Sequence, residues 1–257
     1  MRALDSAMAL AREMQQPVTV LWNIDKTLGC RFDELFISPA GIADFVYRDR
    51  TKKESRLARL LGNLIEKRSR KKGCYLQQSD IDGMMHRDFD FRLLRKYTNI
   101  HIATWEAFFK TTSCFRDFIP VAPLQQMIQS YAEGFENVIG VHIRRTDNAK
   151  SVQHSPTELF LQAMQDEMAA DPAVGFFLAT DDPEEEEAIL KKFPGRITVH
   201  QKKSLRRDDP AAIQDALVDL YCLSRCKKII GSYWSSFTEV AHLLRGAEMH
   251  LAVRQKL

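Results

Sequence analysis

Two arginines and an aspartate follow directly on a short apolar run in the second half of the chain. The run 138–143 predicts a buried strand, and Arg144, Arg145 and Asp147 come after it. Ligands of parallel α/β sheets bind at the carboxyl ends of the strands, and guanidinium groups bind phosphate oxygens in a bidentate fork. His142 shares a strand face with Arg144, two positions away. The pattern favours an anion site over the alternative, a surface ion pair at a strand end.

A second anion-binding feature is the turn 231–236, which joins an expected strand to an expected helix. The free N–H groups of a first helical turn and the hydroxyls of Ser235 and Ser236 can bind an anion. Taken alone, Ser236 is simply an N-cap, and the P-loop pattern is absent from this turn. Beside Arg144 and Arg145, the turn predicts a diphosphate ligand.

Two acidic positions leave alternatives open. Asp181 and Asp182 follow the expected strand 176–180. They suit a metal site, but a helix-capping Asp next to an Asp at the ligand edge explains them equally well. Asp219 lies in an apolar helical pattern, where a carboxylate needs a partner. It is expected either to accept hydrogen bonds from a guanine edge or to form a buried ion pair, for instance with Arg225.

Strands and helices alternate regularly after residue 137, which predicts a parallel, Rossmann-like lobe over 137–257. The expected strands are 138–143, 176–180, 197–200 and 228–231. The expected helix N-caps are Ser155, Asp182, Asp209 and Ser236, with Ser155, Pro156 and Glu158 forming a capping box.

The amino-terminal part, 1–136, is expected to form a second α/β lobe. Residues 4–14 repeat apolar side chains at helical spacing, and 17–22 predicts a buried strand. A further strand is expected at 99–103 and a helix at 123–135. Since α/β folds usually begin with a strand, a helix at the start is unusual.

Composition excludes several classes of protein. The 257 residues are 45% hydrophobic, which excludes intrinsic disorder, and 37 basic against 34 acidic residues give a net charge of +3. This balance argues against a dedicated nucleic-acid binder, so no nucleic-acid partner is expected.

Neither a membrane span nor a signal peptide is expected, which predicts a cytoplasmic protein. Five cysteines, with Cys222 and Cys226 lacking a second ligand pair, predict reduced thiols and no metal.

The segment 48–72 is rich in Lys and Arg and repeats Leu and Ile at helical spacing, which predicts a basic amphipathic helix. It is expected to be an ordinary surface helix, or to contact an anionic membrane or a polyanion.

The runs 138–147, 179–182, 217–224 and 231–237 resemble the donor half of GDP-fucose-dependent fucosyltransferases of the nodulation and core α1,6 types. Weaker similarity covers 2–4 and 30–36. The resemblance implies a GT-B-like α/β fold of two Rossmann-like lobes with parallel sheets. It places acceptor binding in 1–136 and the nucleotide-sugar donor in 137–257. It also implies transfer to a glycan hydroxyl with inversion and without metal or other cofactor.

The resemblance also implies roles for individual residues. Arg144 would hold the β-phosphate and stabilise the GDP leaving group, with Arg145 and Asp147 beside it in the catalytic group. His142 and Asp219 would contact the guanosine. The remaining donor-binding residues would be Asp181, Ser235 and Ser236.

Two departures from the family pattern matter. In the core enzymes, a Glu soon after the Arg motif serves as the general base. Here 148–154 contains no carboxylate, so Asp147 or His154 would have to serve as base. Family members also have a strand and a Gly-rich loop before the segment that matches residues 2–4, and we expect that strand to be missing here. The alternatives are a catalytically inactive nucleotide-sugar-binding homologue, or a module that binds anionic surfaces or nucleic acid through 48–72.

Overall fold

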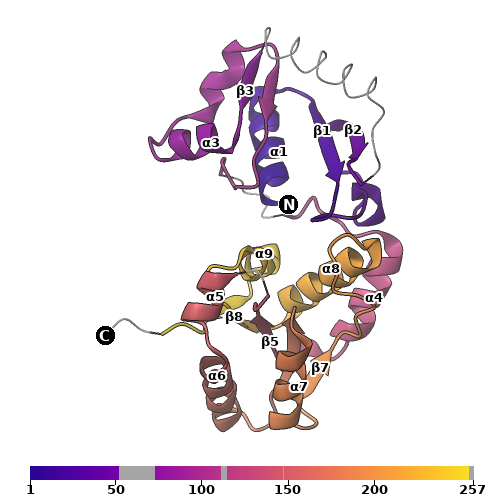
Figure 1. The fold of residues 1–257 in the computed structure, drawn as a ribbon, viewed down its shortest axis with the longest axis vertical. Coiled ribbons are helices and arrows are strands. Elements are labelled where there is room, and N and C mark those ends of the chain that lie inside the picture. The colour runs from indigo at the N-terminus through magenta and orange to yellow at the C-terminus, as the bar shows by residue number, and fades with distance from the viewer. Residues whose placement is uncertain (52–72, 111–114, 147, 255–257) are drawn as a thin grey trace. The chain divides into compact units, whose positions relative to one another are not determined.

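The computed structural model describes residues 1–51, 73–110, 115–146 and 148–254. The chain divides into two compact units, Met1–Ile119 and Pro120–Leu257 (Figure 1). This division falls before the expected boundary at 136/137, because helix α4 (Ala122–Ala132) packs on helix α8 (Pro210–Arg225). Leu124 and Ile128 of α4 are buried.

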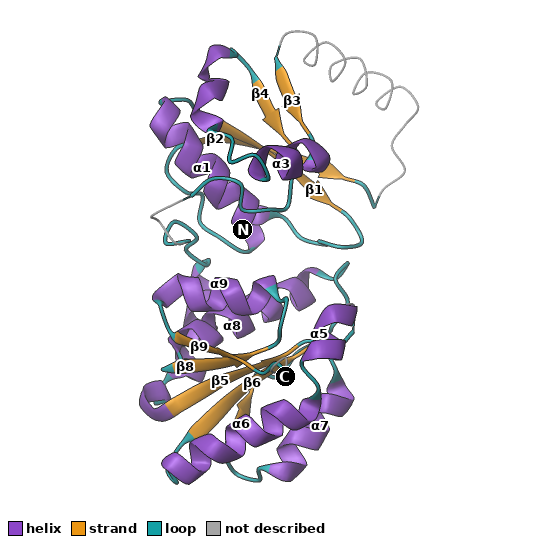
Figure 2. Ribbon diagram, turned by 90° about the vertical axis from the view of Figure 1, so that its left-hand side faces the viewer, coloured by secondary structure: helices purple, strands orange, loops and turns teal. Residues whose placement is uncertain are grey.

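The first unit contains two separate two-stranded parallel sheets and the helices that pack on them (Figure 2). Its elements are α1 (Arg2–Met14), β1 (Val18–Ile24), β2 (Ile42–Asp49), β3 (Cys74–Leu76), α3 (Gln78–Met85) and β4 (Ile100–Ile102). Strand β1 pairs with β2, and β3 with β4. One core cluster joins Leu10 of α1 to Ile81 of α3 and to Phe91. A second gathers aromatic rings around the buried Phe32.

The helix expected at the start of the chain and the strand expected after it are both confirmed, but the strand is not buried as predicted. Leu21 of β1 is 46% exposed and its register partner Val46 of β2 is 42% exposed. Parallel strands are usually covered on both faces.

The second unit is built on one five-stranded parallel sheet with the order β7-β6-β5-β8-β9. In chain order these strands are β5 (Val138–Ile143), β6 (Gly175–Thr180), β7 (Ile197–Val199), β8 (Lys228–Gly231) and β9 (Glu248–Leu251). Its other helices are α5 (Ala149–His154), α6 (Thr157–Ala170), α7 (Pro183–Lys192) and α9 (Ser236–Arg245). In Figure 2, α8 and α9 cover one face of this sheet and α6 and α7 the other. The expected α/β class with parallel sheets is therefore confirmed.

Two of the four predicted N-caps in this unit are confirmed and two are wrong. Asp182 and Asp209 accept hydrogen bonds from the first backbone N–H groups of α7 and α8. Helix α6 begins at Thr157, so the predicted capping box at Ser155 does not form. The Ser155 hydroxyl instead accepts the backbone N–H of Tyr233 at 2.8 Å. Helix α9 has Ser235, and not Ser236, at its N-cap.

In the described part of the chain, no helix combines the length and apolar character needed to cross a bilayer. The predicted basic helix over 48–72 lies mostly outside the described residues, since only 48–51 belong to them. Residues 48 and 49 end strand β2.

The sheet of the second unit approaches α9 so closely at Gly231 that no side chain fits there. A Cβ on Gly231 would lie 2.1 Å from Cγ2 of Thr238. We expect Gly231→Ala to lower the free energy of unfolding by about 1–3 kcal/mol through overpacking, measured by urea unfolding. Adding Thr238→Ser, which removes Cγ2 and keeps the hydroxyl, should recover part of the loss.

Gly175→Ala is the matched control, because a Cβ there meets nothing nearer than 3.6 Å. Equal losses in the two alanine variants would contradict the close-approach explanation.

Candidate active site

The carboxyl ends of β5 and β8 are joined through one buried hydroxyl. The backbone N–H of Arg144 donates to Ser232 Oγ at 2.9 Å, and this hydroxyl donates to the His142 carbonyl at 3.2 Å. Ser232 is completely buried. Its side chain therefore fixes the point at which the chain leaves β5. Sequence reasoning missed Ser232, although its place next to Gly231 at a strand exit was a usable signal.

The Asp181 carboxylate, at the end of β6, organises the loop after β5. It accepts the backbone N–H of Arg145 at 2.8 Å and the Thr146 hydroxyl at 2.5 Å, and Arg144 Nη1 lies 3.0 Å from Oδ2. Burial alone would raise the pKa of Asp181, but these hydrogen bonds and the nearby Arg144 charge outweigh it and hold that pKa below its usual value. Asp181 therefore stays ionised and holds Arg144 in place.

The two adjacent arginines have different surroundings. The Arg145 side chain is 11% exposed, and its Nε and Nη2 donate to the two Glu185 carboxylate oxygens at 3.2 Å each. Further donors of Arg145 reach the Ser155 carbonyl at 3.0 Å and the Thr157 hydroxyl at 3.1 Å. The Arg144 side chain is 21% exposed. Arg145 thus ties the loop to α6 and α7, while Arg144 is the more accessible guanidinium at the strand exit.

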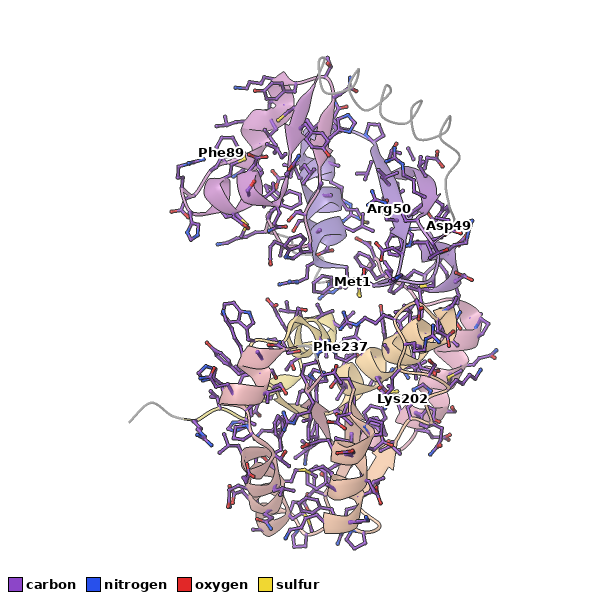
Figure 3. The ribbon with its side chains drawn as sticks, viewed as in Figure 1. Met1, Asp49, Arg50, Phe89, Lys202 and Phe237 are labelled. Atoms are coloured by element: carbon purple, nitrogen blue, oxygen red, sulfur yellow. The ribbon has the colours of Figure 1, made fainter. Side chains whose placement is uncertain are left out.

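His142 is buried on the last part of β5. Its Nδ1 lies 2.7 Å from the Thr238 hydroxyl, and its ring stacks on Phe237 with centroids 4.8 Å apart. Burial, helped by the Arg144 charge, lowers the pKa of His142 to about 3. The imidazole is therefore neutral at physiological pH and links β5 to the first turn of α9. Phe237 is labelled in Figure 3.

Helix α9 begins after strand β8 and the short turn 232–235. Ser235 is its N-cap and makes no side-chain capping hydrogen bond, and Ser236 is exposed in the first turn. The first N–H groups of a helix and its dipole favour an anion. The Ser232 hydrogen bond to Arg144 brings this turn and the Arg144 loop to the same sheet edge.

Asp219 belongs to a buried ionic cluster at the β7 end of the same edge. Its Oδ1 lies 3.3 Å from His200 Nδ1 and its Oδ2 lies 3.3 Å from Lys202 Nζ. His200 Nε2 also lies 3.6 Å from an Asp215 oxygen, and Lys202 is paired with Glu186. A buried ion pair was one of the two expectations for Asp219. Among the described residues, its cationic partner is Lys202 instead of Arg225, and the His200 imidazole lies beside it.

Asp219 Oδ1 and His200 Nδ1 are buried atoms that complete no hydrogen bond in the described structure, although only 3.3 Å separates them. The Asp219 side chain is only 5% exposed. A guanine edge would reach Asp219 only if Lys202, which is labelled in Figure 3, moved off Oδ2.

The remaining predicted positions are Asp147, His154, Asp182 and the two cysteines Cys222 and Cys226. Asp147 lies outside the described residues. His154 ends α5 with its ring 5.2 Å from that of Tyr233. The Asp182 carboxylate caps the N-terminus of α7. No group of three or more metal-ligating side chains occurs within the described ranges. Cys222 and Cys226 are buried free thiols, and burial raises the pKa of both.

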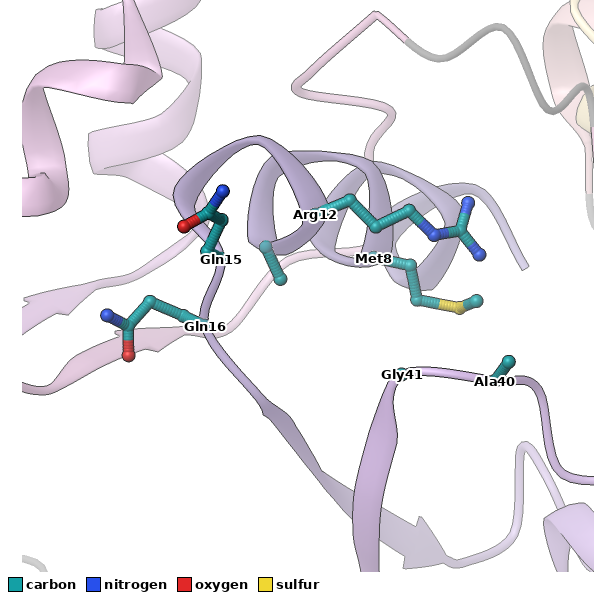
Figure 4. A pocket seen from close by; sticks show the side chains of 7 residues that line it. Met8, Arg12, Gln15, Gln16, Ala40 and Gly41 are labelled. Carbon is teal, nitrogen blue, oxygen red and sulfur yellow. The ribbon is translucent and has the colours of Figure 1, made fainter.

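A small pocket in the first unit lies between the end of α1 and the residues before β2 (Figure 4). It has a volume of about 100 Å³, below the roughly 300–1,000 Å³ of ligand pockets. Its lining residues are Met8, Ala11, Arg12, Gln15, Gln16, Ala40 and Gly41. We therefore do not place a nucleotide there.

Comparison with known proteins shows the fold. No family model and no curated protein matches the sequence. Among solved structures, NodZ alpha-1,6-fucosyltransferase soaked with GDP-fucose matches with a TM-score of 0.59 and 20% identity, over 94% of this chain and 87% of that one. NodZ from Bradyrhizobium matches with a TM-score of 0.59 and 19% identity over the same shares. POFUT1 in complex with GDP-fucose matches with a TM-score of 0.56 and 12% identity, over 96% of this chain and 93% of that one.

The chain therefore has the α/β fold of GT-B fucosyltransferases, as its sequence motifs predicted. At 20% identity or less, the likeness establishes the fold; activity has to be argued from the site itself.

The burial of His142 makes stability depend on pH. The unfolded imidazole takes up a proton near pH 6.5, whereas the folded one stays neutral down to about pH 3. Between these values the unfolded state binds more protons, so the free energy of unfolding should fall as pH decreases, by up to about 1.4 kcal/mol per pH unit from this group.

We expect His142→Asn to flatten this part of the pH–stability profile, and the NMR signals of His142 not to titrate between pH 8 and 5. Titration of His142 near pH 6.5 in the folded protein would contradict its assignment as a buried neutral group.

Proposed function

We propose that this chain is a glycosyltransferase that moves fucose from GDP-fucose to a hydroxyl of a glycan. One observation carries the proposal. Arg144, fixed by Asp181 and Ser232, lies at the same sheet edge as the N-terminus of α9, which lacks a side-chain cap. The shared fold with solved structures that contain GDP or GDP-fucose supports a nucleotide diphosphate as the anion.

In this proposal the diphosphate lies between Arg144 and the first turn of α9, with Ser235 and Ser236 as hydrogen-bond donors. When the bond between sugar and phosphate breaks, negative charge grows on the leaving GDP. A fixed guanidinium and helix N–H groups oriented toward that charge stabilise the transition state more than the ground state. The charge stabilisation is thus assigned to the chain's own groups, and the proposed mechanism uses no metal.

The other residues support Arg144 or contact the nucleoside. We assign Arg145 a positioning role, because its guanidinium is held by Glu185 and Thr157. Asp181 holds the loop. His142 and Asp219 are assigned to the guanosine side, with Lys202 moving aside as the base binds. The acceptor is assigned to the unit Met1–Ile119.

Transfer with inversion requires the acceptor hydroxyl to attack the anomeric carbon from the side opposite the phosphate, while a base removes its proton. The candidates are Asp147 and His154. His154 lies next to Tyr233 in the turn that leads to α9, which supports a place for His154 beside the proposed anion site.

The donor site is tested by thermal shift with GDP, UDP, CDP, ADP, GDP-fucose and GDP-mannose. A ligand at 100 times its dissociation constant stabilises the folded state by about 2.7 kcal/mol. We expect stabilisation by the guanine nucleotides only, and Arg144→Ala should abolish it while leaving the Tm of the free protein within a few degrees of wild type.

Arg145→Ala serves as the contrasting variant. Removing one partner of this largely buried ion pair should cost about 3 kcal/mol in the free protein. Equal loss of stability in the Arg144 and Arg145 variants would contradict their separate roles. Stabilisation by GDP without fucose transfer or GDP-fucose hydrolysis would favour an inactive nucleotide-sugar-binding homologue, whereas no response to any nucleotide would contradict the donor site.

A further inference from the structure

Trp234 is an exposed aromatic residue in the turn between β8 and α9. Its side chain is among the most exposed large apolar groups of the described chain, with 62% of the residue accessible. It lies one position before Ser235, the N-cap of α9. An indole in this place either makes contacts that stabilise the fold or is exposed in order to bind a ligand.

The backbone of Trp234 favours the second explanation. Its φ angle is 56°, in the left-handed region that bulky side chains rarely adopt. Glycine would fit this position with less strain. Strain of this kind persists where surrounding contacts enforce it, and it is frequent at ligand-binding sites. Here the Asn148 side-chain amide enforces it by donating to the Trp234 carbonyl at 2.9 Å.

Asn148 also connects Trp234 to the candidate phosphate site. Its Oδ1 accepts the backbone N–H of Ser151, and the buried Ser151 hydroxyl donates to the Arg144 carbonyl at 3.2 Å. The backbones of Trp234 and Arg144 are therefore joined by one short series of hydrogen bonds. A ligand that contacts Arg144 would find Trp234 in a fixed position.

A cation lies over one face of the indole. Lys150 Nζ lies 4.0 Å from the centroid of the Trp234 ring, a cation–π contact. The Tyr233 ring lies at 6.0 Å with an interplanar angle of 42°. These contacts hold the ring at the surface and leave most of it exposed.

The order of the strands indicates which part of a nucleotide sugar would reach the indole. Asp219 meets His200 just after β7, Arg144 follows β5, and Trp234 follows β8. In the sheet these strands lie in the order β7-β6-β5-β8. A donor with its base toward Asp219 and its diphosphate at Arg144 extends its sugar toward the β8 side, where Trp234 lies.

We propose that the Trp234 indole is a stacking platform for the pyranose ring of the donor, so that it selects the sugar and not the nucleotide. This inference rests on the proposed function. The apolar C–H face of a pyranose fits a flat aromatic ring with a polar edge. Deoxygenation at C6, as in fucose, would extend that apolar face.

The test measures the dissociation constants of GDP and of GDP-fucose by calorimetry, for wild type and three variants of the full chain. We expect Trp234→Ala and Trp234→Gly to weaken GDP-fucose binding roughly fivefold to tenfold, the size of one aromatic contact, and to leave GDP binding unchanged. Trp234→Phe should keep most of the preference. Trp234→Gly also relieves the strained φ, so its Tm should not fall and misfolding cannot account for the result.

Trp105→Ala is the matched control, because Trp105 is 67% exposed and lies in the first unit. It should change neither constant. An unchanged ratio of the two constants in Trp234→Gly, with GDP still bound, would overturn the platform while leaving the donor site intact. Failure of the wild-type protein to bind GDP would instead contradict the proposed function, and the platform with it.

Discussion

The ionised carboxylate of Asp181 is the group on which the candidate site depends. Its side chain is only 19% exposed, yet it holds the backbone of Arg145, the hydroxyl of Thr146 and the guanidinium of Arg144. A buried carboxylate keeps its charge only when such donors compensate for lost hydration. The loop after β5 therefore has one preferred conformation, in which Arg144 remains at the end of the strand. Because the carboxylate comes from β6, this geometry exists only after the parallel sheet has formed.

The two adjacent arginines of this region have different surroundings. Arg145 satisfies its donors on Glu185, Thr157 and a backbone carbonyl, so it joins helices α6 and α7 to the loop. Arg144 lacks so complete an enclosure and keeps contact with solvent. The fully buried Ser232 holds the Arg144 backbone through its hydroxyl, and the glycine before it lets α9 approach β8 closely. In the proposed phosphate site, the guanidinium has to be held in place and also has to stay accessible to the ligand.

Much of the second unit could be predicted from local sequence. Strands β5 and β8 were predicted to the residue, because fully buried parallel strands are uninterrupted apolar runs. The Asp-Pro pairs at 182 and 209 marked helix starts correctly. Ser155 was misassigned because its hydroxyl serves Tyr233, 78 residues away, and no local pattern encodes that contact. For the same reason the partner of Asp219 was sought on its own helix, whereas His200 and Lys202 come from the segment after β7. Strand β2 was missed, since its half-exposed residues mix polar and apolar types.

The central claim is that Arg144 contacts the diphosphate of a guanine nucleotide, and phosphorus NMR tests it most directly. The β-phosphorus resonance of GDP is recorded without protein, with the wild-type protein and with Arg144→Ala. A guanidinium hydrogen-bonded to the terminal phosphate should shift and broaden this resonance in the wild-type sample, and the Arg144→Ala sample should resemble free GDP. A resonance that changes equally with both proteins, or with neither, would contradict the account.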